Sequence, residues 1–213
     1  EIGGAQAVAE AWRNLIATGA KPLAITNNMN FGNPERPKIM GQFVGCIKGM
    51  RDACLKLDFP VVSGNVSLYN ETDGKAIMPT PVIGGIGLLE NASNHITIDL
   101  KGADETIVSI GMLTGWLGQS LYLRELFGQE TGAPPPINLD EEKLNGDFIL
   151  RMIEGKYVTA CHDISDGGLL VAITEMAFSA LVKGKKLGVE IINTAELDPF
   201  AFYFGEEQAR YIV

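Results

Sequence analysis

The chain has 213 residues, of which 46% are hydrophobic and 20% charged, a composition typical of a globular protein with one large or two small domains. Its formal net charge of -9 argues against a nucleic-acid partner, because a phosphate backbone attracts basic surfaces. The charge does not argue against a phosphorylated ligand, which Mg²⁺ and backbone N–H groups can hold.

The sequence also indicates a cellular compartment. No uninterrupted apolar run reaches the roughly 18 residues of a membrane span, and no signal-peptide pattern opens the chain. Three cysteines, Cys46, Cys54 and Cys161, form an odd number without the spacing of metal ligands. We therefore expect free thiols, no membrane partner and a cytoplasmic location.

Both ends of the sequence suggest a piece of a longer protein. The chain starts at Glu1 without a methionine, directly before an expected helix, and it stops at Val213 within an expected strand. We therefore expect a fragment.

The first part of the chain predicts helices and strands in alternation. Helices are expected where apolar residues recur every three or four positions, and strands where β-branched apolar residues run together. Asp73-Gly74 is a strong signal for a two-residue hairpin turn. The expected elements are helix 5–17, strand 22–26, an Asn-rich loop 27–34, helix 37–57, a strand from 61, a hairpin from 69 to 78, and strand 82–89. This mixture indicates an α+β or α/β fold.

The stretch 61–71 combines a strand with a cluster of small polar side chains. Val61-Val62 begins an apolar run that predicts a buried strand, and Gly64 would let a ligand approach the backbone closely. The side chains that follow offer amide and hydroxyl groups without charge: Asn65, Ser67 and Asn70. Strands of α/β proteins often deliver ligand-binding groups to one end of a sheet, so this stretch is a candidate binding site. A polar turn after a strand is the alternative.

The second part follows a polar connector at 90–105. The expected elements are strand 106–112, helix 120–127, a Gly/Pro-rich loop 128–136, helix 140–154, strand 158–161, helix 170–182, strand 187–192 and a last strand at 209–213. The loop before helix 170–182 carries His162, Asp163 and Asp166. His162 is either a general acid or base or a structural histidine, and the aspartates are either Mg²⁺ ligands or, for Asp166, a helix cap.

Five motifs occur in an order that resembles a known family. They are Gly3-Gly4 with its Ala-rich helix, TNNMNFGNP at 26–34, SGNVSLYNET at 63–72, PTPVIG at 79–84 and HDISDGGL at 162–169. Over essentially its whole length the chain resembles the phosphoribosylformylglycinamidine synthases, in particular their small bacterial synthetase subunits. That family belongs to the aminoimidazole ribonucleotide synthetase superfamily.

The resemblance implies an architecture. Family members contain two tandem copies of an A-type and a B-type domain, and this chain looks like part of the second copy. Residues 1–92 would be an N-terminally truncated A-type domain that forms half of a central β-barrel with flanking helices. Residues 93–103 would be a linker, and residues 104–213 a C-terminally truncated B-type α/β domain.

The resemblance also implies a reaction. The family converts formylglycinamide ribonucleotide, ATP and ammonia from glutamine into formylglycinamidine ribonucleotide, ADP and phosphate, with Mg²⁺ as cofactor. The implied partners are the first half of the same synthetase chain, a glutaminase subunit and a small bridging subunit. An isolated fragment would be inactive.

Motif matching assigns Asn27 and Gly64 to ATP, Asn65 to Mg²⁺ and Ser67 to the substrate, and it assigns no catalytic residue. The family commonly has Asp where this sequence has Asn27, so a hydrogen-bond acceptor is kept but a charge is lost. One alternative is a scaffold half with a silent nucleotide site. Another is a different enzyme of the superfamily, against which the motifs around Asn30 and Asn65 argue.

Overall fold

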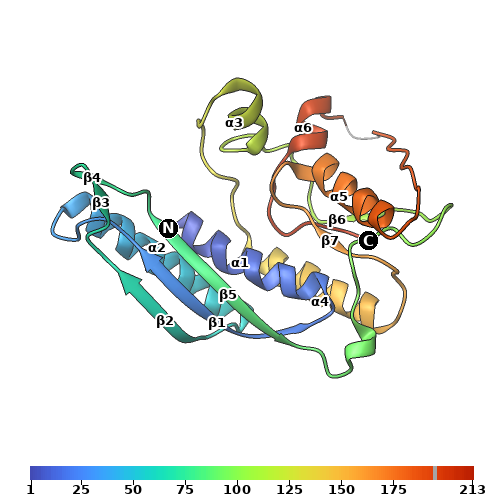
Figure 1. The fold of residues 1–213 in the computed structure, drawn as a ribbon, viewed down its shortest axis with the longest axis horizontal. Helices are drawn as coiled ribbons and strands as arrows, with labels where there is room; N and C mark the ends of the chain where they lie inside the picture. The colour runs from blue at the N-terminus through green and yellow to red at the C-terminus, as the bar shows by residue number, and fades with distance from the viewer. Residues whose placement is uncertain (194–195) are drawn as a thin grey trace. The chain divides into compact units, whose positions relative to one another are not determined.

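The computed structural model describes residues 1–193 and 196–213 and divides them into two compact units (Figure 1). The first unit contains residues 1–15 and 20–88, and the second contains residues 16–19 and 89–213. Among the described residues, no helix combines the length and the apolar character needed to cross a membrane.

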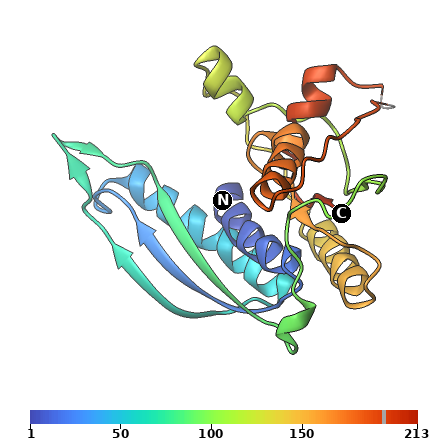
Figure 2. The same cartoon turned by 45° about the vertical axis from the view of Figure 1, so that its right-hand side comes forward.

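The first unit is a three-stranded sheet with two helices. Its elements are α1 (Ile2–Ala17), β1 (Lys21–Asn30), α2 (Pro37–Leu57), β2 (Val61–Ser67), β3 (Glu71–Thr72), β4 (Lys75–Ala76) and β5 (Thr80–Leu88). The strand order is β2-β1-β5, with β2 parallel and β5 antiparallel to β1, and β3 and β4 form the hairpin predicted around Asp73-Gly74. Figures 1 and 2 show α1 and α2 on the same side of this sheet.

The helix-covered face of the sheet forms the core of this unit. Ile25 and Met29 of β1 are buried on that face, and a Cβ at Gly85 of β5 would touch Leu15 of α1. Gly4 of α1 allows the two helices to approach closely, because a Cβ at this position would overlap the backbone of Cys46 on α2. The opposite face of the three strands carries no helix of this unit, so its side chains are exposed.

Two predictions for the first unit are wrong. Residues 27–30, expected in a loop, continue β1, because β2 on one side and β5 on the other supply a ladder of backbone hydrogen bonds for them. The strand from Val61, expected to be buried, is the exposed edge of the sheet, with Val62 65% exposed. The two helices are confirmed, although α1 begins three residues earlier than expected.

The second unit packs around one side of an apolar helix, α5. Its elements are the short 3-10 helix η1 (Ala92–Asn94), β6 (Ser109–Ile110), α3 (Leu121–Phe127), α4 (Leu139–Glu154), β7 (His162–Asp163), α5 (Gly168–Val182), α6 (Pro199–Phe204) and β8 (Tyr211–Ile212). The strands form an antiparallel sheet in the order β6-β8-β7. A buried cluster around Ile164, Ile173, Met176 and Ile212 forms its core.

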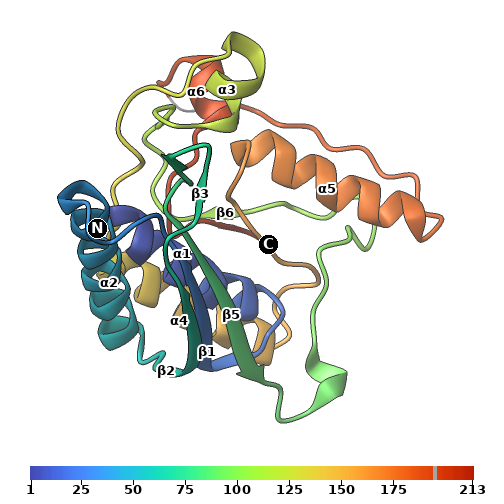
Figure 3. The same ribbon diagram turned by 60° about the vertical axis from the view of Figure 1, so that its left-hand side comes forward.

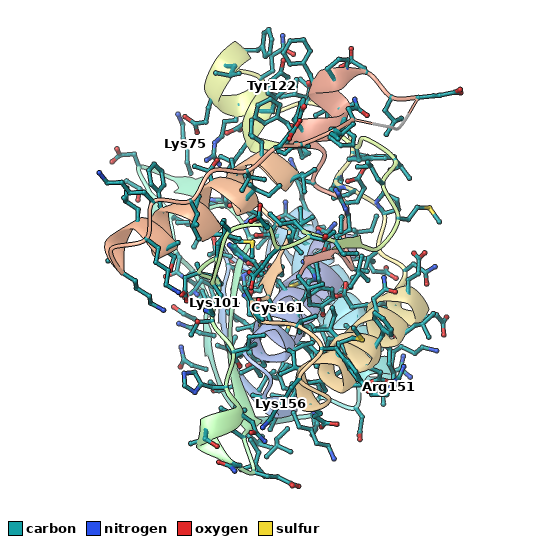
Figure 4. All side chains as sticks on the ribbon, turned by 90° about the vertical axis from the view of Figure 1, so that its right-hand side faces the viewer. Lys75, Lys101, Tyr122, Arg151, Lys156 and Cys161 are labelled. Carbon is teal, nitrogen blue, oxygen red and sulfur yellow. The ribbon has the colours of Figure 1, made fainter. Side chains whose placement is uncertain are left out.

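Helices α3 and α6 lie near the N-terminal end of α5 (Figures 1 and 3). Tyr122 of α3 stacks on Phe204 of α6 with a ring-centroid distance of 4.8 Å, and it also meets Phe200 at 5.7 Å (Figure 4). These aromatic contacts join two short helices that expose much of their surface.

The helices predicted for the second unit are confirmed within two residues, the largest difference being at α5, which begins at Gly168, but its strands are shorter than predicted. Of the strand expected at 106–112, only β6 (Ser109–Ile110) forms. The strand expected at 158–161 does not form, and the short strand β7 (His162–Asp163) follows that segment directly. Residues 187–192 form no strand. Their apolar alternation is nevertheless real, because Leu187, Val189 and Ile191 pack against the core without a partner strand.

Candidate functional site

The predicted ligand-binding residues lie on the paired strands β1 and β2. In the parallel register, Asn27 is opposite Gly64 and Asn28 is opposite Asn65. Paired residues of neighbouring strands point to the same face of a sheet, and successive residues point to opposite faces. The structure therefore brings Asn27 together with Gly64 on the helix-covered face. It places Asn65 on the open face, with Asn28.

The packing of Asn27 explains why position 64 is a glycine. A Cβ at position 64 would overlap Asn27 Oδ1 and lie 3.2 Å from Asn27 Cγ. The space that we expected a ligand to use is thus filled by the partly buried Asn27 amide. A nucleotide contact at Gly64 has to share this face with that side chain.

Asn65 and Asn28 form a side-chain hydrogen bond on the open face. Asn65 Nδ2 donates to Asn28 Oδ1 over 3.1 Å, and both residues are exposed. On the other side of Asn28, β5 contributes Val82, which is 51% exposed. Asn28 therefore sits at the centre of a row of three exposed side chains, one from each strand.

Ser67 is held at the end of β2 by Asn70. Asn70 Nδ2 donates to the backbone carbonyl oxygens of Ser67, at 2.9 Å, and Phe31, at 3.1 Å. Ser67 Oγ lies 3.1 Å from Asn70 Nδ2 and 3.3 Å from Asn70 Oδ1. The Asn70 amide thus joins the ends of β1 and β2, and it already binds the hydroxyl that we expected to meet the substrate.

Asn28 is the residue of this region that sequence reasoning missed. Residues 27–34 were interpreted as a loop, which concealed the alternation of side chains along β1. The signal was present in the spacing of Thr26, Asn28 and Asn30, every second residue of a strand, which marks one polar face.

The oxygen atoms near Asn65 that could coordinate a metal suit Mg²⁺ only together with a phosphate-bearing ligand. Within residues 1–193 and 196–213, no group of three His, Cys, Asp or Glu side chains could hold a metal ion. Mg²⁺ usually keeps several waters and is bound through one or two protein side chains and substrate phosphates. The neutral oxygen Asn65 Oδ1 fits such a role, although it would not hold the ion alone.

His162 lies between two carboxylates in the second unit. Its Nδ1 is 3.2 Å from Asp163 Oδ1, and its Nε2 is 2.9 Å from Glu175 Oε2 on α5. Burial lowers the pKa of His162, but the hydrogen bonds and charges of these carboxylates outweigh burial and raise the pKa above its ordinary value. Because both ring nitrogens are engaged, the structural interpretation of His162 is favoured. The neighbouring Cys161 thiol is inert, since burial raises its pKa to about 12.

Asp166 is not the cap of α5. It is exposed, and the N-cap position of α5 is Gly167, whose φ of 77° suits a glycine. The Gly167 N–H donates instead to Glu206 Oε1 over 2.7 Å, and the same oxygen accepts the N–H of Leu121 over 2.8 Å. Sequence reasoning did not identify Glu206 as the group that joins these two helix starts.

Glu207 holds the loop before α3. Its Oε1 accepts the backbone N–H groups of Thr114 and Trp116, both over 2.8 Å, and its Oε2 lies 2.7 Å from Nη1 of the fully buried Arg210. Burial raises the pKa of Glu207, but these N–H donors and Arg210 lower it more, so the carboxylate remains charged. These contacts indicate a structural role.

Two family models match the chain. Residues 1–89 match the N-terminal domain of AIR synthase related proteins, and residues 103–213 match the C-terminal domain of the same family. Phosphoribosylformylglycinamidine synthase subunit PurL of Bradyrhizobium diazoefficiens is 58% identical over 211 residues, which cover 99% of this chain and 28% of that protein. The chain thus spans little more than a quarter of the length of the curated relatives that it matches.

Solved structures show the same fold. Phosphoribosylformylglycinamidine synthase II of Thermotoga maritima matches with 25% identity and a TM-score of 0.65, over 99% of this chain and 28% of that one. Thermotoga maritima PurL complexed with ATP matches with 20% identity and a TM-score of 0.69, over 100% and 32%. The same protein complexed with FGAR matches with 20% identity and a TM-score of 0.69, over 99% of this chain and 34% of that one. The structure of PurLQS from Thermotoga maritima matches with 24% identity and a TM-score of 0.65, over 99% of this chain and 28% of that one.

The two domain matches, in this order along the sequence, agree with the mixed α+β structure of the chain. The chain belongs to the AIR synthase related protein family.

Proposed function

We propose that this chain is part of the synthetase that converts formylglycinamide ribonucleotide, ATP and ammonia into formylglycinamidine ribonucleotide, ADP and phosphate. The observation that carries the proposal is the 58% identity to a PurL subunit over 99% of the chain. The complexes of Thermotoga maritima PurL with ATP and with FGAR support the two substrates.

We propose that residues 1–92 act as the A-type domain, residues 93–103 as a linker and residues 104–213 as the B-type domain of one tandem copy. The open face of β2-β1-β5 exposes apolar side chains that a monomeric domain would bury, among them Val82 at 51% and Ile86 at 56%. This exposure supports closure of the face against a second A-type domain in a β-barrel. That domain would come from the first half of the same synthetase chain.

In this proposal the reaction is a phosphoryl transfer followed by a displacement. ATP phosphorylates the amide oxygen of the substrate, and ammonia then displaces the phosphate. Bound Mg²⁺ would neutralise phosphate charge. Asn27 and Gly64 would contact ATP, Asn65 would offer its amide oxygen to Mg²⁺, and Ser67 would position the substrate.

Partners and compartment follow from the same assignment. PurL of Thermotoga maritima occurs in a structure of PurLQS. We propose that this synthetase likewise works with a glutaminase subunit, which supplies the ammonia, and a small bridging subunit. The free cysteines Cys46, Cys54 and Cys161 support a reducing cytoplasm.

One observation favours a second candidate, a scaffold half around a silent nucleotide site. Asn27 fills the space beside Gly64, and the two residues assigned to ATP lie on the opposite face of the sheet from Asn65. A site that no longer works could keep such residues for packing alone.

The test of the proposed function is turnover by the full-length synthetase with ammonia as nitrogen donor. We expect ADP to form only when formylglycinamide ribonucleotide and Mg²⁺ are both present, and we expect the isolated 213-residue segment to be inactive. ADP formation at the same rate with and without formylglycinamide ribonucleotide would contradict the proposal for the full-length protein. Turnover by the isolated segment would contradict the expected need for the rest of the chain.

A further inference from the structure

We propose that Asn28 is a positioning residue that orients the amide of Asn65, so that its oxygen faces a magnesium–nucleotide ligand. The inference rests on the proposed function, in which Asn65 is a metal ligand. Its basis is the hydrogen bond from Asn65 Nδ2 to Asn28 Oδ1, 3.1 Å long, between directly paired residues of β1 and β2.

An asparagine can bind a cation only in one of two orientations. The two ends of its amide have nearly the same shape, but the oxygen is an acceptor and the NH₂ group is a pair of donors. If the amide turned by half a rotation, it would present hydrogens to the cation. The partner of the nitrogen therefore decides whether Asn65 is a ligand.

The Asn28 acceptor resolves this choice. It engages Asn65 Nδ2, and among residues 1–193 and 196–213 no group donates a hydrogen bond to Asn65 Oδ1. Asn65 is exposed in this chain, on the face that is proposed to meet the second A-type domain, so a ligand at its oxygen would lie between the two domains. The bond uses the nitrogen and leaves the oxygen available.

Asn28 is itself well placed to serve as a fixed support. It lies on the central strand of the sheet, paired with Asn65 on β2 and with Val82 on β5. A group at an edge or in a loop would hold the amide of Asn65 less firmly.

Metal affinity tests the inference with a readout other than turnover. Mn²⁺ replaces Mg²⁺ in an electron paramagnetic resonance titration of the full-length synthetase with a non-hydrolysable ATP analogue. Groups that orient a metal ligand typically contribute 10- to 100-fold to affinity, so Asn28→Ala is expected to weaken Mn²⁺ binding about tenfold or more. Asn28→Asp is expected to restore most of it, because a carboxylate accepts from Asn65 Nδ2 in either orientation.

Val82→Ala is the matched control. It removes a side chain beside Asn28 on the same face but leaves the Asn28–Asn65 bond intact, so Mn²⁺ affinity should not change. Melting temperatures are recorded for every variant. If Asn28→Ala does not fold, Asn28→Leu gives the same comparison, because its side chain is close to that of Asn in size and carries no acceptor.

The outcomes separate this inference from the proposed function. Wild-type Mn²⁺ affinity in Asn28→Ala, with affinity lost in Asn65→Ala, would overturn the role of Asn28 and leave that of Asn65 standing. Equal losses in Asn28→Ala and Asn28→Asp would also overturn it, because the acceptor would not be the cause. Unchanged affinity in Asn65→Ala would remove the metal role of Asn65 and with it the inference. The proposed function itself fails only if the wild-type synthetase does not turn over formylglycinamide ribonucleotide.

Discussion

Gly64 faces Asn27 across the β1–β2 ladder, and the Asn27 amide occupies the position that a Cβ of residue 64 would need. Gly64→Ala should therefore destabilise the protein by about 1–3 kcal/mol, the usual cost of overpacking. Combining it with Asn27→Ala should recover part of that loss, with a coupling of about 0.5–3 kcal/mol between the two positions. Denaturant unfolding of the single and double variants measures the coupling.

Gly84→Ala is the matched control for this cycle. It also adds a methyl group to the sheet, but its Cβ would lie on the open face, 3.0 Å from the Thr26 side chain and 3.9 Å from the Thr26 backbone oxygen. It should show no coupling to Asn27→Ala. If the changes in the free energy of unfolding caused by Gly64→Ala and Asn27→Ala were strictly additive, the packing explanation of Gly64 would be contradicted.

Removal of the Glu207 carboxylate should strongly destabilise the second unit. Glu207 is the ion-pair partner of the fully buried Arg210 and accepts two backbone N–H groups. Glu207→Ala would leave a buried guanidinium unpaired, which typically costs about 3–5 kcal/mol.

The neighbouring Glu206→Ala change tests whether this loss is specific. It removes an acceptor for Gly167 and Leu121 but breaks no ion pair with a buried arginine, so its effect should be smaller. Thermal unfolding of both variants gives the comparison. A larger loss of melting temperature in Glu206→Ala would contradict the assigned importance of Arg210.

His162 should make the stability of the second unit depend on pH. Its pKa is raised in the folded state, where Asp163 and Glu175 pair with the charged ring. The stabilising effect is therefore fully present below the unfolded-state pKa of about 6.5 and is lost as the pH rises through the higher folded-state pKa. Melting temperatures of the wild type and His162→Gln should differ most below about pH 6.5 and converge in alkaline buffer.

His95→Gln serves as the reference for this measurement. The His95 ring faces the backbone carbonyl of Ala92, at 2.8 Å, and the residue is exposed, so any effect common to losing a histidine is subtracted. A wild-type advantage over His162→Gln that grows with pH would show that the carboxylates do not hold the charged ring.

The sequence predicted the helices better than the strands, and the reason is physical. Helix signals are local, and α2, α4 and α5 follow their apolar periodicity. Strands depend on distant partners. Asn27 and Asn28, in a segment too polar for a predicted strand, pair with two neighbours, whereas the apolar segment 187–192 pairs with no strand in the part of the chain that the structure describes.

The candidate site shows the same limit. Motif matching selected Asn27, Gly64, Asn65 and Ser67, and all four lie on β1 and β2. Their division between two faces follows from the register of β1 against β2, which composition and spacing do not reveal. Asn28 was missed for the same reason, because its role depends on the residue opposite.

In the proposed function, Asn65 serves a working magnesium–nucleotide site. The most direct measurement is steady-state kinetics of the full-length synthetase carrying Asn65→Ala, with ammonia as nitrogen donor and the melting temperature recorded alongside. We expect kcat to fall by more than about tenfold at an unchanged melting temperature. Near-normal turnover with a lowered melting temperature would contradict it and would make this part of the protein a scaffold around a silent pocket.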